Sequence, residues 1–134
     1  MKKIICMVGL LTALSLLVGC GNNSTKGSVL LKEGEVKEIS VSSLPEGYNY
    51  SFTGESVGAI IDYLAGLNLS SDFSENPDEY GGMTWVIVLE YDDNSEVELY
   101  HFGNMFIMVE GGSWYKMNYD EANQFSTLIE GLSE

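Results

Sequence analysis

The chain has 134 residues, is 45% hydrophobic and 11% aromatic, and carries a formal net charge of −14, with 20 acidic residues against six lysines and no arginine. So large an acidic excess argues against a nucleic-acid partner and against a domain that lies on an anionic bilayer, because both require a basic surface. The aromatic content argues against a disordered acidic tail, because it supplies side chains for a core.

The first residues have the features of a secretion signal. Lys2 and Lys3 precede an apolar run over residues 4–18. A basic start followed by about 15 apolar residues is typical of a signal peptide, and the run is too short for a stable transmembrane helix. We therefore expect residues 1–19 to be a signal peptide.

The end of this segment reads Leu17-Val18-Gly19-Cys20, which resembles the lipobox of bacterial lipoproteins. The resemblance implies that a diacylglyceryl group is attached to the Cys20 sulfur and that the signal is cleaved after Gly19. Double acylation anchors a protein firmly where a single chain would not. We expect a protein tethered through Cys20 to the extracytoplasmic face of the cell membrane.

The remainder divides into a tether and one domain. Residues 20–34, with a small and polar stretch at 21–28, are expected to form the lipidated cysteine and a flexible linker. Residues 35–134 are expected to form a single α+β domain. The sequence has two cysteines, Cys6 in the signal and Cys20 at its end, so we expect no disulfide in the domain. Loss of the two signal lysines leaves four lysines against 20 acidic residues, a net charge of −16.

Hydrophobic periodicity predicts the elements in chain order. An irregular strand begins near Val36, a short one covers 48–52, and apolar residues at helical spacing predict a helix over 55–67. A long polar loop over 68–82 follows. The last expected elements are strands at 83–91, 95–102, 105–109 and 113–117 and a helix at 119–132. We therefore expect an α+β fold, an antiparallel four- to six-stranded sheet (meander) with two helices packed on one face.

From residue 35 on, the pattern is similar to that of small, uncharacterised cell-surface lipoproteins of Gram-positive bacteria. The segments that carry this similarity are Tyr91-Asp92-Asp93-Asn94-Ser95 and Trp114-Tyr115-Lys116. The resemblance does not assign an active site to any residue of this sequence.

Strand register follows from how apolar residues align across the first hairpin. A three-residue loop, Asp92-Asp93-Asn94, places Leu89 opposite Val97 and Ile87 opposite Leu99, which gathers the apolar side chains on one face. Such a loop needs one residue in the left-handed region, which an asparagine at its last position tolerates. The side chains expected beneath the helices are Trp85, Ile87, Leu89, Val97 and Leu99.

Extending this register to the later strands predicts which face of the sheet is the candidate interaction surface. Two-residue turns at Gly103-Asn104 and Gly111-Gly112 would place Leu99 beside Met108, and Met108 beside Tyr115. The buried face would then continue through Phe106, Met108, Tyr115 and Met117. The opposite face would carry Val86, Val88, Tyr100, Ile107, Val109 and Trp114. We interpret that face as a candidate interaction surface anchored by Tyr100 and Trp114. The alternatives are that residues 36–52 fold over it, or that it holds only aromatic cross-strand pairs.

The side chains needed for catalysis are sparse. His101 is the only histidine, and we expect it to be structural. Carboxylates are abundant, but a glycosidase also needs a deep cleft in which two of them face each other, so their number alone does not indicate this activity. Two acidic segments, 72–79 and 92–96, could offer oxygens to calcium, but neither has the glycine and bidentate glutamate of an EF-hand loop. We expect no catalytic residues, no metal site and no cofactor.

Together these features predict a non-enzymatic binding or protein-interaction module with an envelope protein or peptide as partner and no nucleic acid. The alternative is a small-ligand or cation-binding lipoprotein, or an unrecognised envelope enzyme. A deep pocket with convergent polar groups would favour the alternative, and a flat sheet face with exposed aromatic side chains would favour the interaction module.

Overall fold

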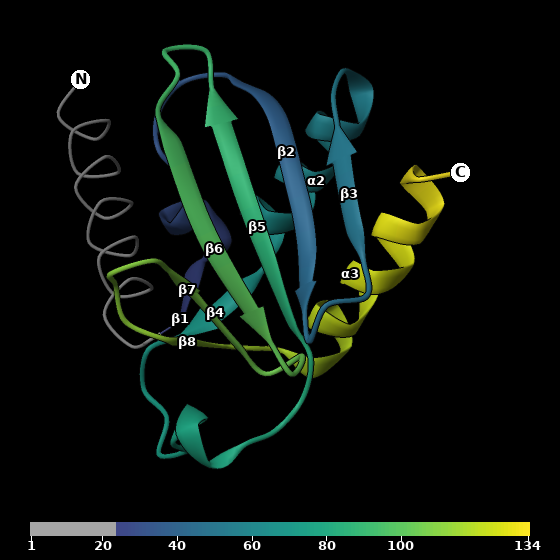
Figure 1. The fold of residues 1–134 in the computed structure, drawn as a ribbon. Coiled ribbons are helices and arrows are strands. Elements are labelled where there is room, and N and C mark those ends of the chain that lie inside the picture. Colours follow the sequence, from purple (N-terminus) through teal and green to yellow (C-terminus); the bar gives the residue numbers. More distant parts are fainter. Residues whose placement is uncertain (1–23) are drawn as a thin grey trace, which may run out of the picture.

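A computed structural model describes residues 24–134, so the expected signal peptide, the lipobox and Cys20 lie outside the described residues. These residues form an α+β fold with one antiparallel eight-stranded sheet and two helices (Figure 1). The helices are α2 (Glu55–Gly66) and α3 (Tyr119–Leu132), and two 3-10 turns are η1 (Gly27–Leu30) and η2 (Pro77–Glu79). The strands are β1 (Ser24–Lys26), β2 (Val36–Leu44), β3 (Asn49–Phe52), β4 (Asn68–Ser70), β5 (Thr84–Tyr91), β6 (Glu96–Phe102), β7 (Phe106–Val109) and β8 (Tyr115–Met117). Their order across the sheet is β1-β4-β8-β7-β6-β5-β2-β3.

The expected strand count of four to six was too low, because two short strands were missed. β4 lies in the segment expected to be a loop and pairs with β8, and β1 pairs with β4, with Thr25 opposite Leu69. Both strands are only three residues long and mostly polar, so they show no clear alternation. They form because the free edge of β8 offers unpaired backbone groups.

The prediction of a flexible linker over residues 20–34 was wrong from Ser24 on. The N–H of Gly27 donates a 2.8 Å hydrogen bond to the carbonyl of Leu67, and Leu30 is only 2% exposed in the core. A Cβ on Gly27 would overlap the carbonyl oxygen of Leu64, so only glycine allows this close approach to α2. The folded part therefore begins before residue 35.

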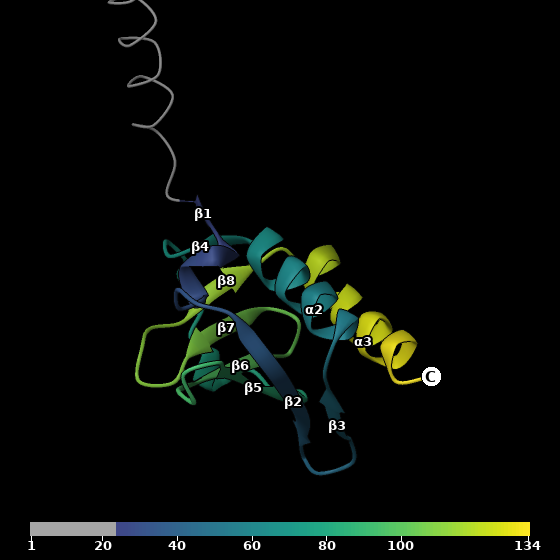
Figure 2. The same ribbon diagram turned by 90° about the horizontal axis from the view of Figure 1, so that it is seen from above.

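The two helices form where the apolar spacing predicts them. In α2 the side chains of Val57, Ile60 and Leu64 are buried, one helical turn apart. In α3 the side chain of Asn118 accepts a 3.1 Å hydrogen bond from the N–H of Glu121, which caps the helix. Figure 2 shows α2 and α3 lying side by side.

The core joins side chains from the helices with alternate residues of the sheet. Along β5 every second side chain is buried, starting with Trp85. Its ring meets that of Phe125 on α3 edge to face, with centroids 5.7 Å apart. Phe125 also stacks on His101 of β6 at 4.9 Å. Aromatic contacts thus connect α3 to β5 and β6.

The register predicted for the first hairpin is confirmed. Ile87 lies opposite Leu99 and Leu89 opposite Val97, as a three-residue loop requires. Asn94 has a φ of 70°, in the left-handed region. Of the five side chains assigned to the core, Trp85, Ile87, Leu89 and Leu99 are buried, and Val97 packs partly buried against them.

The register predicted for the next hairpin was wrong by one residue. Leu99 lies opposite Val109 rather than Met108, and Met108 lies opposite Tyr100. The turn takes one residue more than expected, with Asn104 in the left-handed region at a φ of 55°. Because side chains alternate along a strand, this slip exchanges the two faces of β7.

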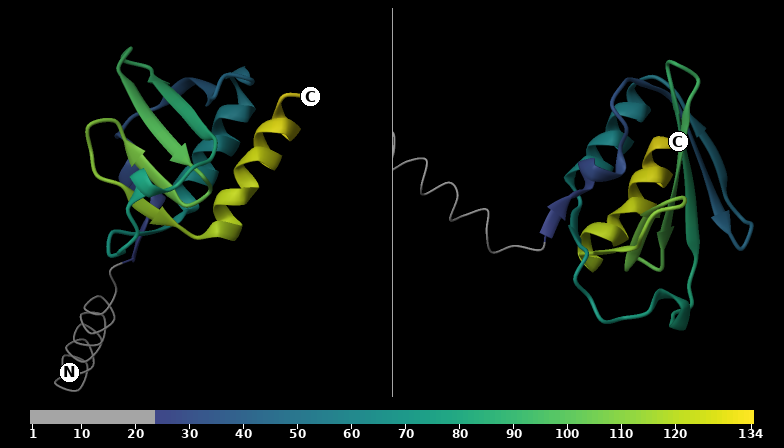
Figure 3. Two further views of the ribbon diagram at one scale, coloured as in Figure 1. Left: turned by 60° about the horizontal axis from the view of Figure 1, so that its bottom comes forward. Right: turned by 90° about the vertical axis from the view of Figure 1, so that its left-hand side faces the viewer.

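The segment over residues 36–52 does not cover the opposite face. It forms β2 and β3, which extend the sheet through β2–β5 and β2–β3 pairing. Instead, part of the chain between β4 and β5, residues 71–83, lies at one end of the sheet (Figure 3). The rings of Phe73 and Tyr80 from this segment pack over Phe106. The loop before β5, and not residues 36–52, therefore covers part of the sheet face opposite the main core.

Candidate functional site

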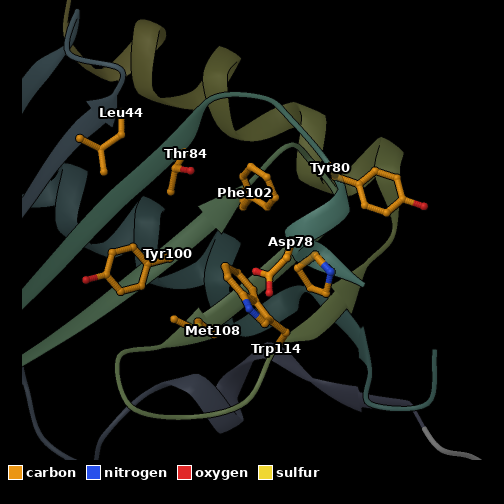
Figure 4. A pocket seen from close by; sticks show the side chains of 9 residues that line it. Leu44, Asp78, Tyr80, Thr84, Tyr100, Phe102, Met108 and Trp114 are labelled. Carbon is orange, nitrogen blue, oxygen red and sulfur yellow. The ribbon is translucent and has the colours of Figure 1, made fainter. Parts of the chain in front are cut away.

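An open hollow of about 380 Å³ lies on the sheet face opposite the core (Figure 4). Its floor is formed by side chains that alternate outward from four adjacent strands, β2, β5, β6 and β7, and its walls by η2 and the segment before β8. The lining residues are Leu44, Pro77, Asp78, Tyr80, Thr84, Tyr100, Phe102, Met108 and Trp114. Rings and aliphatic groups dominate this lining, and Asp78 is its one carboxylate.

A second aromatic cluster supports the walls of the hollow. Phe106 is fully buried although it faces away from the main core. The rings of Phe73 and Tyr80, each 5.6 Å from it, cover it from the segment over residues 71–83. Trp114 and Phe102 close its other sides, with centroids at 6.2 Å and 6.4 Å. The wall residues are therefore held by packing from below.

Acidic side chains border the hollow beyond Tyr100. The Tyr100 hydroxyl donates a 3.2 Å hydrogen bond to the carboxylate of Glu98. Partial burial, together with this hydrogen bond and the charges of Glu98 and Glu110, raises the pKa of Tyr100. The pKa of Glu110 is also raised, by its hydrogen bond with the carboxyl group of Glu98 and by the negative charge there. Two carboxylates thus share this position and repel each other.

The four lysines of the described residues are all engaged elsewhere. Lys32 pairs with Asp93 at 3.0 Å and Lys37 with Glu90 at 3.2 Å, and Lys116 pairs with Glu75. Lys26 donates to the side chain of Asn68 at 2.7 Å. Within residues 24–134 the carboxylate of Asp78 has no hydrogen-bond or ion-pair partner, while its N–H donates to Asn76. The negative charge of the hollow is therefore not compensated by a lysine of the domain.

The structure keeps four of the six predicted surface residues on this face. Tyr100 and Trp114 are half-buried in the lining of the hollow. Val86 and Val88 are half-buried and pair with Tyr100 and Glu98, which places them on the same face.

Ile107 and Val109 do not belong to the surface. Ile107 is 0% exposed, and Val109 packs against the core opposite Leu99. The same slip of register brings Phe106 and Met108, which were assigned to the core, to the outer face. The register predicted for the turn at Gly111-Gly112 was also wrong by one residue, because Ile107 rather than Met108 lies opposite Tyr115. This second slip leaves Tyr115 and Met117 on their expected side.

Sequence reasoning missed several lining residues. Phe102 follows Tyr100 by two positions in one strand, so the alternation of side chains could have found it. Tyr80 and Asp78 come from the segment before β5, and no periodic signal connects them to the sheet.

His101, which was expected to be structural, lies in the core. It is fully buried, and the hydroxyl of Tyr63 lies 3.1 Å from its Nε2. Burial lowers the pKa of His101 to about 4.

Within residues 24–134, no three His, Cys, Asp or Glu side chains are grouped so that they could hold a metal ion. Among the helices of residues 24–134, none is long and apolar enough to cross a membrane.

Comparison with known proteins gives no relative: no family model, no curated protein and no solved structure matches the chain.

Proposed function

We propose that this protein is a non-enzymatic binding module, held at the extracytoplasmic face of the cell membrane by a lipid on Cys20, that engages an envelope protein or peptide. The lipobox-like ending supports the anchor. The open aromatic hollow on the outer sheet face carries the assignment of the binding surface.

We further propose that both helices pack on one face of the sheet and leave the other face for the partner. Support comes from the contact of Trp85 with Phe125 and from the common cluster that buried helix and sheet residues form. Figure 3 draws α2 and α3 on the same side of the sheet.

The composition of the hollow suits protein recognition. Tyr and Trp side chains are among the residues that most often dominate the free energy of protein interfaces, above all when a partner fully desolvates them at the centre of the contact and polar groups surround them. Tyr100 and Trp114 meet this description, with Glu98 and Asp78 at the border of the apolar patch.

A small ligand is the second candidate. A volume of about 380 Å³ lies within the range of small-molecule sites. The hollow is open, however, and has one charged group, so it offers a small ligand little enclosure. An extended peptide that crosses the face would bury more surface.

Capture from envelope extract tests the binding surface. The intact protein, its Trp114→Ala/Tyr100→Ala variant and a Tyr119→Ala control are compared as bait. Tyr119 is 59% exposed at the start of α3, so the control removes an aromatic ring away from the hollow. We expect the double variant, shown to be folded by its thermal transition, to lose partners that the wild type and the control retain. Retention of the same partners by all three baits would contradict the proposal.

A further inference from the structure

Building on the function proposed above, we propose that the hollow receives a lysine or arginine side chain from an extended segment of the protein partner, and that the Glu98–Glu110 pair receives a second basic side chain of the same segment. The evidence is the arrangement of rings and carboxylates on the outer face.

The first position is built from ring faces and one carboxylate. Phe102 and Trp114 lie with centroids 6.1 Å apart and interplanar angle 47°, and both rings line the hollow. Asp78 lines the same hollow, and Figure 4 draws its carboxylate beside the Trp114 indole. A cation above aromatic faces is attracted by their quadrupoles, and a neighbouring carboxylate adds a direct charge interaction.

The molecule already contains one contact of this type. The Nζ of Lys32 lies 5.3 Å from the centroid of the Tyr91 ring while it pairs with Asp93. No lysine of the described residues reaches the hollow in this way, since all four are held by other partners. Within residues 24–134 no lysine is left to pair with Asp78, and a basic side chain of the partner would supply the missing cation.

The second position is the pair of carboxylates next to Tyr100. The N–H of Glu110 donates a 2.9 Å hydrogen bond to the carbonyl of Glu98, next to the pairing of Leu99 with Val109, so the two glutamates lie across from each other on one face. A cation between their carboxylates would offset the repulsion of the two charges. Glu98 and Phe102 point to the same face of β6 and are four residues apart, a separation of about 13 Å at the rise of a strand. An extended peptide spans the same distance between basic residues that are four positions apart.

A defined peptide tests this spacing and charge. The probe is a fluorescein-labelled Gly-Arg-Ser-Ala-Ser-Arg-Gly, and binding to the intact protein in detergent micelles is measured by fluorescence anisotropy. Its control replaces both arginines by citrulline, which keeps the shape and removes the charge. We expect the arginine peptide to bind, the citrulline peptide to bind at least tenfold more weakly, and the affinity to fall as salt rises.

Protein variants locate the two positions. Asp78→Asn and Glu98→Gln each remove one charge, and the second keeps an oxygen that can accept from Tyr100. We expect each to weaken the peptide about three- to fivefold and the double variant to weaken it more than tenfold. Glu130→Gln removes an equal charge from the exposed side of α3 and should leave the affinity unchanged.

Several results would overturn this inference: equal binding of the arginine and citrulline peptides, unchanged affinity of Asp78→Asn, or an equal loss in Glu130→Gln. Absence of peptide binding would overturn it too. If envelope capture still depends on Trp114 and Tyr100 in that case, the proposed function stands and the partner is not basic. If neither assay shows dependence, both proposals are wrong.

Discussion

The hydroxyl of Tyr63 on α2 lies 3.1 Å from Nε2 of His101 on β6, and this contact joins helix and sheet in the middle of the core. The hydroxyl also lies 3.3 Å from the carbonyl of Ala122 on α3. Burial, with a smaller contribution from Glu121, raises the pKa of Tyr63, so its proton is retained at all ordinary pH values. His101 is neutral at pH 7, with no partner for its Nδ1 among the described residues.

This contact predicts a pH-dependent stability. Because burial lowers the pKa of His101 from 6.5 to about 4, the unfolded chain binds a proton that the folded protein does not bind between these values. The contribution of neutral His101 to the free energy of unfolding is complete above pH 6.5 and is lost as the pH falls towards 4. Between pH 7 and pH 5 we expect the free energy of unfolding to fall by roughly 2 kcal/mol from this group, measured by urea denaturation.

The control for this effect is His101→Phe. Phenylalanine keeps the ring that stacks on Phe125, while the Tyr63 hydroxyl keeps the Ala122 carbonyl. The many carboxylates titrate in both proteins, so the difference between them isolates His101. An identical pH slope in the variant would show that His101 is not the group responsible.

Gly27→Ala tests whether the segment before residue 35 is part of the fold. The added methyl group would overlap the Leu64 carbonyl, so we expect a loss of about 1–3 kcal/mol and faster hydrogen exchange in residues 24–30. Gly58→Ala is the matched control, since a methyl group there meets nothing and alanine favours helix. The control should be unchanged or more stable by up to about 1 kcal/mol. Equal stability of the two variants would mean that β1 and η1 are not docked.

The first hairpin predicts an effect at Asn94. Its φ of 70° is costly for a branched side chain, so Asn94→Val should lower the thermal midpoint by about 4–8 °C, and Asn94→Gly should stay near the wild type. Both variants lose the 2.6 Å hydrogen bond from Lys37, so that contact cancels in the comparison. Equal midpoints for valine and glycine would refute the left-handed conformation.

Lipidation at Cys20 is a prediction from the lipobox-like ending. Mass spectrometry of protein extracted from membranes should show an acylated Cys20 as the first residue, and Cys20→Ala should release the protein or leave an uncleaved precursor. Cys6→Ala serves as the control, because Cys6 lies in the expected signal. A mature protein that begins elsewhere and carries no lipid would contradict the prediction.

The sequence by itself determined the elements with a strong period and the register of one hairpin. The helix expected over 119–132 is α3, and the one expected over 55–67 ends one residue earlier as α2. In β5 and β6 only one register joins the apolar side chains, because shifting it by one residue would pair Leu89 with Glu98. The candidate anchor Tyr100 depended on the register of β5 and β6, whereas Trp114 was placed through two later turns whose predicted registers were wrong by one residue each; both residues line the hollow.

Tertiary structure decided the second hairpin and the walls of the hollow. In β7 both Phe106 and Ile107 are buried, one beneath the segment over residues 71–83 and one in the main core. Apolar side chains on both faces remove the alternation that fixes register, so the local pattern could not choose between a two- and a three-residue turn. Likewise, β1 and β4 exist because a sheet edge is available beside them, and Asp78 reaches the hollow only through the path of its loop. These features depend on contacts between distant segments, which no local period encodes.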